Sequence, residues 1–365
     1  EAAAALKRTY GEAFPTYTYN DWMRLARASF REEGGKLRLD YDPMLATALK
    51  QMAAAPLDLW PAFDRPVYAT AFTAAMLRAK RASDGINVDL DLRIIEQRKP
   101  FEVGPFTVEA IPVVHSIPES NALYITCPAG RAVHTGDWKL EERPVSGLPT
   151  DKKRFEAIGA EAGPLALICD STNALKEGTS PDESEVAVNL ERIIREAPNR
   201  VAFTVFASNL GRVISIAKAA QKAGREVVLA GRSLHRIANV GQELGMLDGL
   251  PTFHDQDAFQ HLARNKICLI CTGSQGESRA AIARIAREEH PVIDLDAGDR
   301  VVFSSWAIPG NEKEVQDIQN RLIDKGVDVI TNSDDLVHVT GHPRREELRT
   351  LYSWLNPSIL VPVHG

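Results

Sequence analysis

The amino-acid sequence predicts an α/β protein whose main sheet is parallel and covered by helices on both faces. Residues 183–331 alternate amphipathic stretches of helix length with short apolar stretches of strand length. The apolar stretches lack the period-two alternation of a half-exposed strand, which indicates strands buried on both faces. Residues 88–115 and 122–134 instead have the pattern of hairpins, with turns at Gly104 and Gly130, so a second, antiparallel part is expected.

Length and composition allow more than one core. The 365 residues, 44% of them hydrophobic, suffice for two domains or one large one. The net charge of −6 argues against a protein held on nucleic acid by bulk charge, although it is compatible with a local basic groove. No apolar run approaches the roughly 18 residues of a membrane span, and residues 1–5 lack the form of a signal peptide. We therefore expect a cytoplasmic protein without a membrane partner.

The four cysteines lie inside apolar, strand-like runs, which predicts buried thiols rather than a disulfide framework. Cys268 and Cys271 form a Cys-x-x-Cys pattern, but the run Ile-Cys-Leu-Ile-Cys around them is that of a buried strand. We interpret this pair as structural, with a redox or zinc role as the alternative.

The elements can be predicted in order along the chain. Residues 1–64 are expected to be helical, because an apolar run with helical spacing reaches Phe30 and a second one covers residues 44–55. The expected strands cover residues 66–70, 166–170, 200–206, 226–230, 267–271, 300–304, 327–331 and 358–363. The expected helices after residue 64 cover residues 72–82, 183–197, 210–223, 234–244, 279–288, 312–325 and 345–355.

Three histidines near the carboxyl end of the sequence have the arrangement of a site. His338 and His342 bracket a small turn, and His364 closes an apolar run 22 residues after His342. A strand–helix–strand path of this length can return the last histidine to the sheet edge of the others. Gly341 allows backbone N–H groups to approach an anion closely, and Thr340 adds a hydroxyl. Each histidine alone would be interpreted as a core residue beside a turn, whereas the three together favour a functional site.

Further side chains of the kind that bind metals follow other strands. His115 and Asp137 each come after an apolar run, and Asp137 lies in a glycine turn. Imidazole and carboxylate groups are the ligands of hydrolytic zinc or manganese sites, and a carboxylate can bridge two ions. Asp170 ends another apolar strand, where a turn or helix cap is its alternative role.

Several strand-to-helix turns have the composition of phosphate-binding sites. Ser208 and Asn209 end one strand and open the next helix, where free N–H groups and the positive helix end favour an anion. Residues 271–277 and 304–312 repeat this arrangement. Small polar turns are common at such places, but several on one sheet edge favour a phosphate-rich ligand.

From about residue 65 to residue 365 the sequence resembles ribonuclease J, a metallo-β-lactamase-fold nuclease with an inserted β-CASP domain. The resemblance implies an α/β fold in which a metallo-β-lactamase αββα half is interrupted by a Rossmann-like parallel sheet. The implied parts are residues 65–175 and 336–365 for the first half and residues 176–335 for the β-CASP domain. The matching stretches follow the family's order: residues 115–121, 134–139, 169–173, 206–209, 271–277, 308–312, 338–342 and 362–365.

The resemblance also implies a role for each candidate residue. His115 and Asp137 would be metal ligands, with Asp137 bridging two divalent ions, and His364 would bind the second ion. Asp170 and His342 would be the acid–histidine pair beside the scissile phosphate. The residues that would hold RNA phosphates, including a 5′-terminal monophosphate, are His338, Val339, Thr340, Gly341, His342, Ser208 and Asn209.

The implied activity is hydrolysis of RNA phosphodiesters by metal-activated water, both from the 5′ end and internally. The implied cofactors are two divalent metal ions, zinc or manganese. The implied partners are RNA, especially with a 5′-monophosphate, and further copies of the chain in a homo-oligomer. The family acts in RNA decay and processing, including ribosomal RNA, in the cytoplasm.

The sequence departs from the family before His115. The family's His-x-His-x-Asp-His motif, expected shortly before residues 58–61, is absent, and no histidine precedes His115. Of seven metal ligands that the resemblance implies, only His115, Asp137 and His364 are present, so we expect impaired activity. The family's first strands, and its last ones after Gly365, also lack a counterpart, so we expect an incomplete metallo-β-lactamase half.

Residues 1–64 are foreign to the family. Residues 10–15 and 40–43 resemble the cap region of an α/β-hydrolase, without that family's nucleophile. A fusion, an assembly artefact and a splice over omitted residues are alternative explanations of a join near residues 58–61.

Two other classes of function compete with the nuclease. A non-catalytic module would bind RNA or its 5′-monophosphate in the phosphate pocket without chemistry. An α/β-hydrolase-type esterase would need a Gly-x-Ser-x-Gly elbow, and the sequence contains none. The metal content of the purified protein separates these classes best.

Overall fold

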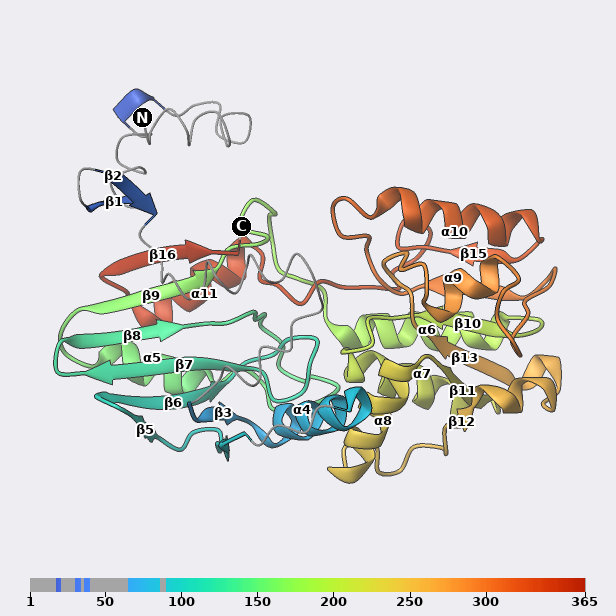
Figure 1. Cartoon of the computed structure of the whole chain (residues 1–365), viewed down its shortest axis with the longest axis horizontal. Helices are drawn as coiled ribbons and strands as arrows, with labels where there is room; N and C mark the ends of the chain where they lie inside the picture. Colours follow the sequence, from blue (N-terminus) through green and yellow to red (C-terminus); the bar gives the residue numbers. More distant parts are fainter. Residues whose placement is uncertain (1–17, 21–29, 34–35, 40–64, 86–89, 365) are drawn as a thin grey trace. The chain divides into compact units, whose positions relative to one another are not determined.

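The structure is a computed structural model that describes residues 18–20, 30–33, 36–39, 65–85 and 90–364 (Figure 1). Its contacts divide the chain into two units, Glu1–Arg65 and Pro66–Gly365.

The first unit contains a β-hairpin where helix was expected. Strands β1 (Phe30–Glu33) and β2 (Lys36–Leu39) pair antiparallel, with Glu33 opposite Lys36. The prediction of helix up to Phe30 is therefore wrong at that residue. The sequence between the strands is Gly34-Gly35, and a glycine pair favours a two-residue hairpin turn and opposes a helix. The second expected helix, residues 44–55, lies outside the described residues.

The second unit contains a mixed six-stranded sheet in the order β16-β9-β8-β7-β6-β5. The pairs from β5 to β8 are antiparallel, as the hairpin pattern predicted, whereas β8, β9 and β16 are parallel. The parallel strands therefore have their carboxyl ends at one edge of the sheet. The strands are β5 (Phe101–Val103), β6 (Phe106–Pro112), β7 (Asn121–Cys127), β8 (Gly130–His134), β9 (Leu165–Asp170) and β16 (Ile359–Val363).

Two helices pack together against this sheet, α5 (Lys152–Ala160) and α11 (Arg345–Leu355). They share one buried core with the strands, and its largest side chain is the fully buried Trp138. The helices approach so closely at Gly159 that a Cβ there would lie 2.0 Å from the carbonyl oxygen of Trp354. Helix α5 was not predicted from the sequence, whereas α11 was.

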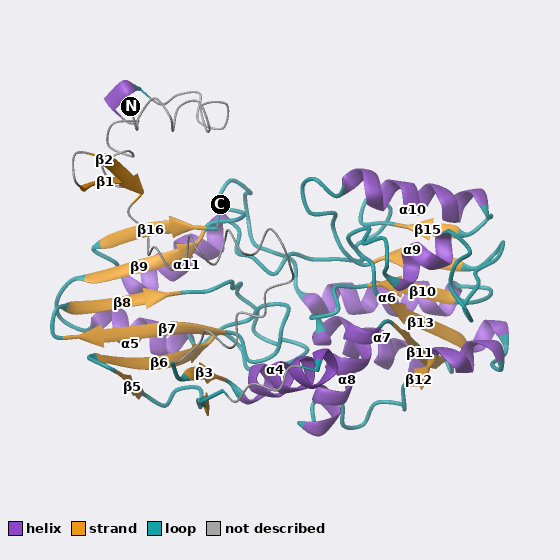
Figure 2. Ribbon diagram, viewed as in Figure 1, coloured by secondary structure: helices purple, strands orange, loops and turns teal. Residues whose placement is uncertain are grey.

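A second six-stranded sheet, in the order β12-β11-β13-β10-β14-β15, is parallel throughout (Figure 2). The prediction of a parallel sheet is confirmed. Only the edge strand β12, two residues long, was not foreseen. The strands are β10 (Val201–Thr204), β11 (Glu226–Ala230), β12 (His254–Asp255), β13 (Ile267–Cys271), β14 (Arg300–Phe303) and β15 (Asp328–Ile330).

Both faces of this sheet are buried, because successive residues of its central strands point into different cores. Cys268 and Ile270 of β13 belong to one cluster, and Leu269 and Cys271 to the other. Helices α6 (Glu183–Glu196), α7 (Leu210–Lys222) and α8 (Arg232–Glu243) contribute to the first cluster. Helices α9 (Ala281–Ala286) and α10 (Glu312–Asp324) contribute to the second. This two-sided burial is the reason that the strands are apolar along their whole length.

A short parallel pair of strands precedes these sheets in the second unit, β3 (Val67–Ala69) and β4 (Leu92–Ile94). Helix α4 (Ala71–Asp84) lies between them in sequence and contacts α8. Helix α4 ends at Gly85, whose left-handed φ of 70° closes the last turn.

Burial of the cysteines agrees with the sequence prediction for Cys169, Cys268 and Cys271, whereas Cys127 is only half-buried. All four are free, and three of them are buried. Burial raises the pKa of both Cys268 and Cys271 to about 12, so these thiols are protonated and inert at neutral pH. Among the helices described here, none is long and apolar enough to cross a membrane.

Candidate metal and phosphate site

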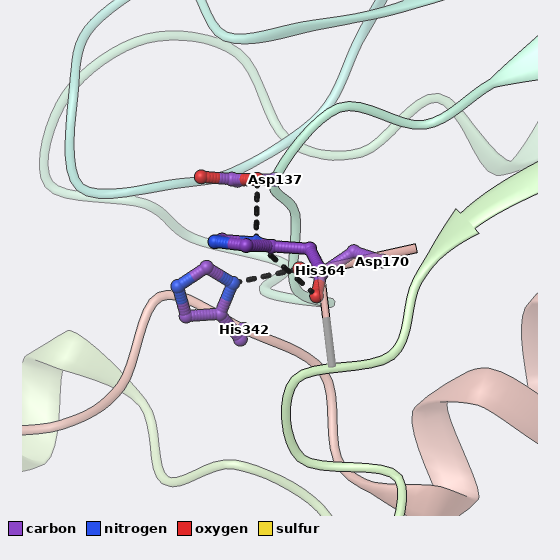
Figure 3. A group of neighbouring side chains, drawn as sticks. All are labelled: Asp137, Asp170, His342 and His364. Atoms are coloured by element: carbon purple, nitrogen blue, oxygen red, sulfur yellow. Dashed lines mark hydrogen bonds and ion pairs between the residues drawn. The ribbon is translucent and has the colours of Figure 1, made fainter. Parts of the chain in front are cut away.

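Four candidate side chains meet at the edge where the parallel strands of the mixed sheet end (Figure 3). Asp137 follows β8, Asp170 ends β9 and His364 follows β16. Because these three strands are neighbours and parallel, the side chains after them meet at one edge. His342 joins them from the segment before α11.

The distances within this cluster are those of groups that can share an ion. One ligand atom from each of Asp137, Asp170, His342 and His364 lies within 4.8 Å of all the others. His364 Nδ1 is 3.1 Å from Asp137 Oδ1 and 3.8 Å from Asp170 Oδ1. His342 Nδ1 is 2.7 Å from Asp170 Oδ2.

His115 lies beside the cluster and its tautomer can be inferred. Its Nδ1 is 2.9 Å from the carbonyl oxygen of Gly341, which can only accept a hydrogen bond. Nδ1 therefore carries the proton in the neutral ring, and the lone pair of Nε2 lies 3.8 Å from Asp137 Oδ2. A histidine whose second nitrogen is fixed by a backbone carbonyl is typical of metal sites. Burial lowers the pKa of His115, which favours this neutral form.

A glycine at position 341 is required for this contact. A Cβ on residue 341 would lie 2.4 Å from Nδ1 of His115, far closer than van der Waals contact. Gly341 therefore brings its carbonyl to His115 as well as shaping the turn between His338 and His342.

Asp170 and His342 form a charged pair. Burial alone would raise the pKa of Asp170, but hydrogen bonds from His342 and from the hydroxyl and backbone N–H of Thr172 hold it below its usual value. For His342, burial lowers the pKa, but the bond to Asp170 more than offsets it and raises the pKa above its usual value. The pairing therefore favours the carboxylate form of Asp170 and the protonated form of His342, and the carboxylate is almost completely buried.

The donor set fits a divalent metal ion. It contains imidazole nitrogens and carboxylate oxygens and no thiol, which suits zinc or manganese. The two oxygens of Asp137 face different histidines, Oδ1 towards His364 and Oδ2 towards His115. A bridging carboxylate has this arrangement. Asp170 and His342 are engaged with each other. Asp137, His364 and His115 are therefore the remaining candidate ligands, with the hydroxyl of Thr172 3.3 Å from Nδ1 of His364.

Only some of the predicted phosphate-binding residues lie close together. Val339, Thr340 and Gly341 line a cavity of about 30 Å³ together with Asn209 and Lys139. The carboxamide oxygen of Asn209 accepts a hydrogen bond from the backbone N–H of Arg212 and so caps α7. Ser208, just before it, is exposed and does not line this cavity.

His338 lies between two aromatic rings rather than in that cavity. Its ring centroid is 6.3 Å from those of both Phe206 and Trp306. Burial, together with the charge of Arg212, lowers the pKa of His338 to about 3. The imidazole is therefore neutral at neutral pH and offers an aromatic surface rather than a charge.

Sequence analysis missed a set of buried charges next to these residues. Lys139 Nζ is 2.9 Å from Glu141 Oε2, and both side chains are buried. Arg212 is fully buried in α7, pairs with Glu183 and donates to the hydroxyl of Ser304 and the carbonyl of Val337. An arginine within the apolar run of α7 is the signal that could have revealed it, because an arginine is almost never fully buried unless paired.

Comparison with known proteins shows what this chain is similar to. A family model described as the β-CASP domain of ribonuclease J matches residues 198–322. Ribonuclease J of Sinorhizobium meliloti is 52% identical over 308 residues, 84% of this chain and 54% of that protein. Ribonuclease J of Thermus thermophilus is 36% identical over 302 residues, 82% of this chain and 52% of that protein. The chain thus spans about half the length of the curated relatives it matches.

Among solved structures, a protein of unknown function from Enterococcus faecalis V583 has a similar fold. The TM-score is 0.57 at 17% identity, and the match covers 83% of this chain and 70% of that chain. At this identity the likeness concerns the fold alone.

The two sheets and their helices define an α/β protein with a β-CASP domain. The chain belongs to the ribonuclease J family. The predictions of fold class and family are confirmed. The boundaries at residues 64, 175 and 335, and the role of each site residue, stay predictions.

Proposed function

We propose that this chain is a ribonuclease J-like nuclease that cleaves RNA phosphodiester bonds with divalent metal ions. The main support is the convergence of Asp137, Asp170, His342 and His364, with ligand atoms within 4.8 Å of one another, in a chain of this family.

In this proposal Asp137, His364 and His115 hold the ions, which are zinc or manganese. When bound, such ions activate a water molecule and stabilise the charge that develops on the phosphate. Asp137 is suited to bridging because its two oxygens face different histidines. His115 keeps its Nε2 available because Gly341 engages Nδ1.

In the proposed mechanism, His342 is the proton or hydrogen-bond donor and Asp170 supports it. Because Asp170 favours the protonated form of His342, His342 can donate a hydrogen bond to a phosphate oxygen or a proton to the leaving oxygen. Thr172 in turn holds the carboxylate of Asp170 by two hydrogen bonds.

We also propose that the chain binds the 5′-monophosphate of RNA. Ser208 and Asn209 stand at the start of α7, and Val339, Thr340 and Gly341 line the same small cavity as Asn209. The free N–H groups and the positive end of a helix favour phosphate without any metal. Cleavage from the 5′ end and internally, action on ribosomal RNA, a cytoplasmic location and a homo-oligomer are part of the same proposal and have only the family as support.

The nuclease activity is proposed to be weak. No histidine precedes His115, so the ions have fewer protein ligands than the family's motif would supply. The competing function is a non-catalytic module that binds RNA or its 5′-monophosphate, and the same missing histidines favour it.

Degradation of 5′-monophosphorylated RNA with added zinc or manganese tests the proposal. We expect slow, metal-dependent cleavage that Asp137→Ala abolishes, with RNA affinity retained. RNA binding without any cleavage at saturating metal would favour the non-catalytic module. Fast cleavage that requires Asp137 would contradict the proposed impairment, and absence of both binding and cleavage would contradict the whole proposal.

A further inference from the structure

We propose that Trp306 is a stacking platform for a nucleobase of single-stranded RNA, and that Lys176 beside it contacts the phosphate of the same strand. This inference rests on the proposed function. It adds a binding surface that is separate from both the metal cluster and the phosphate cavity.

Trp306 is held out in solvent by a fixed loop. The loop connects β14 to α10, and 46% of the surface of Trp306 is exposed. The carboxamide of the buried Gln275 donates to the carbonyl of Trp306 at 2.8 Å and accepts from the N–H of Ile308 at 2.7 Å. These two bonds fix the backbone on both sides of residue 307, so the loop presents the indole at the surface. An exposed tryptophan in a fixed position is typical of a binding surface.

A cation lies against the ring of Trp306. The ammonium of Lys176 is 4.7 Å from the ring centroid. Within the described part of the chain, no carboxylate pairs with Lys176, whereas Arg345 pairs with Glu177. An unpaired cation on an aromatic face presents both groups that single-stranded nucleic acid uses, a π surface for the base and a charge for the phosphate.

The aromatic surface extends towards the proposed active site. The ring of His338 lies at 49° to Trp306 and at 51° to Phe206. His338 begins the segment that ends at His342, which pairs with Asp170. Four residues of extended chain span at most about 14 Å, so a strand of RNA at the cluster can reach Trp306.

The opening beside Trp306 is lined by side chains that can form hydrogen bonds with the edge of a base. Its volume is about 500 Å³, and besides Trp306 it is lined by Gln316, Gln319 and Asn332. Carboxamides donate and accept hydrogen bonds, as base edges do. The oxygen of Asn332 already accepts from the N–H groups of Val337 and His338, which leaves its amino group free to donate. The nearby carboxylate of Glu312 is engaged by the N–H of Gly310.

Binding of a 5′-monophosphorylated single-stranded RNA to the full chain, followed by fluorescence anisotropy without metal, tests the inference. We expect Trp306→Ala to raise the dissociation constant about tenfold and Trp306→Phe to raise it less, because stacking needs an aromatic ring. Ile308→Ala is the matched control, since Ile308 lies in the same loop and is 51% exposed. It should leave the affinity unchanged.

Two further measurements separate stacking from charge. Lys176→Gln should reduce the slope of log affinity against log salt by about 0.7, whereas Trp306→Ala should leave that slope unchanged. An RNA with abasic residues should bind the wild type and Trp306→Ala equally.

The outcomes are distinct. A wild type that binds no RNA would overturn the proposed function and this inference together. If the wild type binds RNA but Trp306→Ala behaves as Ile308→Ala does, the inference alone is wrong. If Trp306→Ala changes the molar mass in solution and not the affinity, the ring is a protein contact and the inference is again wrong. Equal thermal midpoints of the variants check that each one folds.

Discussion

His342 and Asp170 form an ion pair in which Nδ1 and Oδ2 are 2.7 Å apart, although 172 residues separate them in the chain. Asp170 ends β9 and is almost completely buried, while His342 arrives on the segment that leads into α11. A buried carboxylate needs such a partner, because an unpaired charge would be costly to remove from water. The pair thus orients His342 towards the metal-type cluster and favours its protonated form.

Asp170→Asn is expected to lower the pKa of His342. In the wild type Asp170 holds that pKa above its usual value, and without the carboxylate the burial of the ring dominates. Titration of the His342 ring signals by NMR in metal-free protein measures the change. If the pKa of His342 stays raised in Asp170→Asn, a group other than Asp170 is responsible for raising it.

The same pair has a defined effect on stability. His342, with its raised pKa, contributes stability below the usual histidine pKa, and this contribution is lost as pH rises through the raised value. Asp170, with its lowered pKa, contributes above the usual aspartate pKa, and this contribution is lost as pH falls through the lowered value. The pair therefore stabilises the fold most at pH values between the usual pKa of aspartate and the usual pKa of histidine.

His338 should make the protein less stable in acid. Its pKa is lowered to about 3, so between the usual histidine pKa and 3 the unfolded chain binds a proton that the folded chain excludes. The free energy of unfolding should thus fall as pH is lowered through this range. Denaturation by urea at several pH values measures it, and His338→Phe should make the dependence shallower. An unchanged slope in His338→Phe would contradict the neutral, buried ring.

Asp137 and His364 should be needed for metal binding. We expect Asp137→Asn and His364→Ala each to weaken zinc or manganese binding by more than the roughly 10-fold that loss of an outer partner costs. Calorimetric titration of the purified protein measures this. His254→Ala is the control. His254 of β12 pairs with Glu226 of β11, and both strands belong to the other sheet. Equal losses in all three variants would mean that the cluster does not hold the ion.

Arg212 should contribute strongly to the free energy of unfolding, because it connects α7 to Val337. Arg212→Ala leaves the largely buried Glu183 without its cation and removes donors from Ser304 and Val337, which should cost about 3–5 kcal/mol. Arg349→Ala, which breaks an exposed pair with Glu346, should cost less than about 1 kcal/mol. Chemical denaturation compares them. A cost for Arg212→Ala as small as that for Arg349→Ala would show that the buried network is not stabilising.

Part of this protein follows from its sequence alone. The apolar runs at β10, β13 and β14 predict a sheet covered on both faces, because such strands are stable only when both faces are buried. The position of Asp137 and His364 just after apolar runs predicts a site at a sheet edge. In these cases a local pattern determines burial, and burial determines the type of element.

Tertiary structure decided the rest. Phe30 lies in a strand although its apolar spacing in the sequence is helical, and α5 packs against α11. Above all, the order β16-β9-β8 decides that His364 lies 3.1 Å from Asp137. Spacing along a chain limits how far apart two residues can lie. Only the order of the strands decides that they touch, because that order depends on the burial of the whole sheet rather than on any local run of residues.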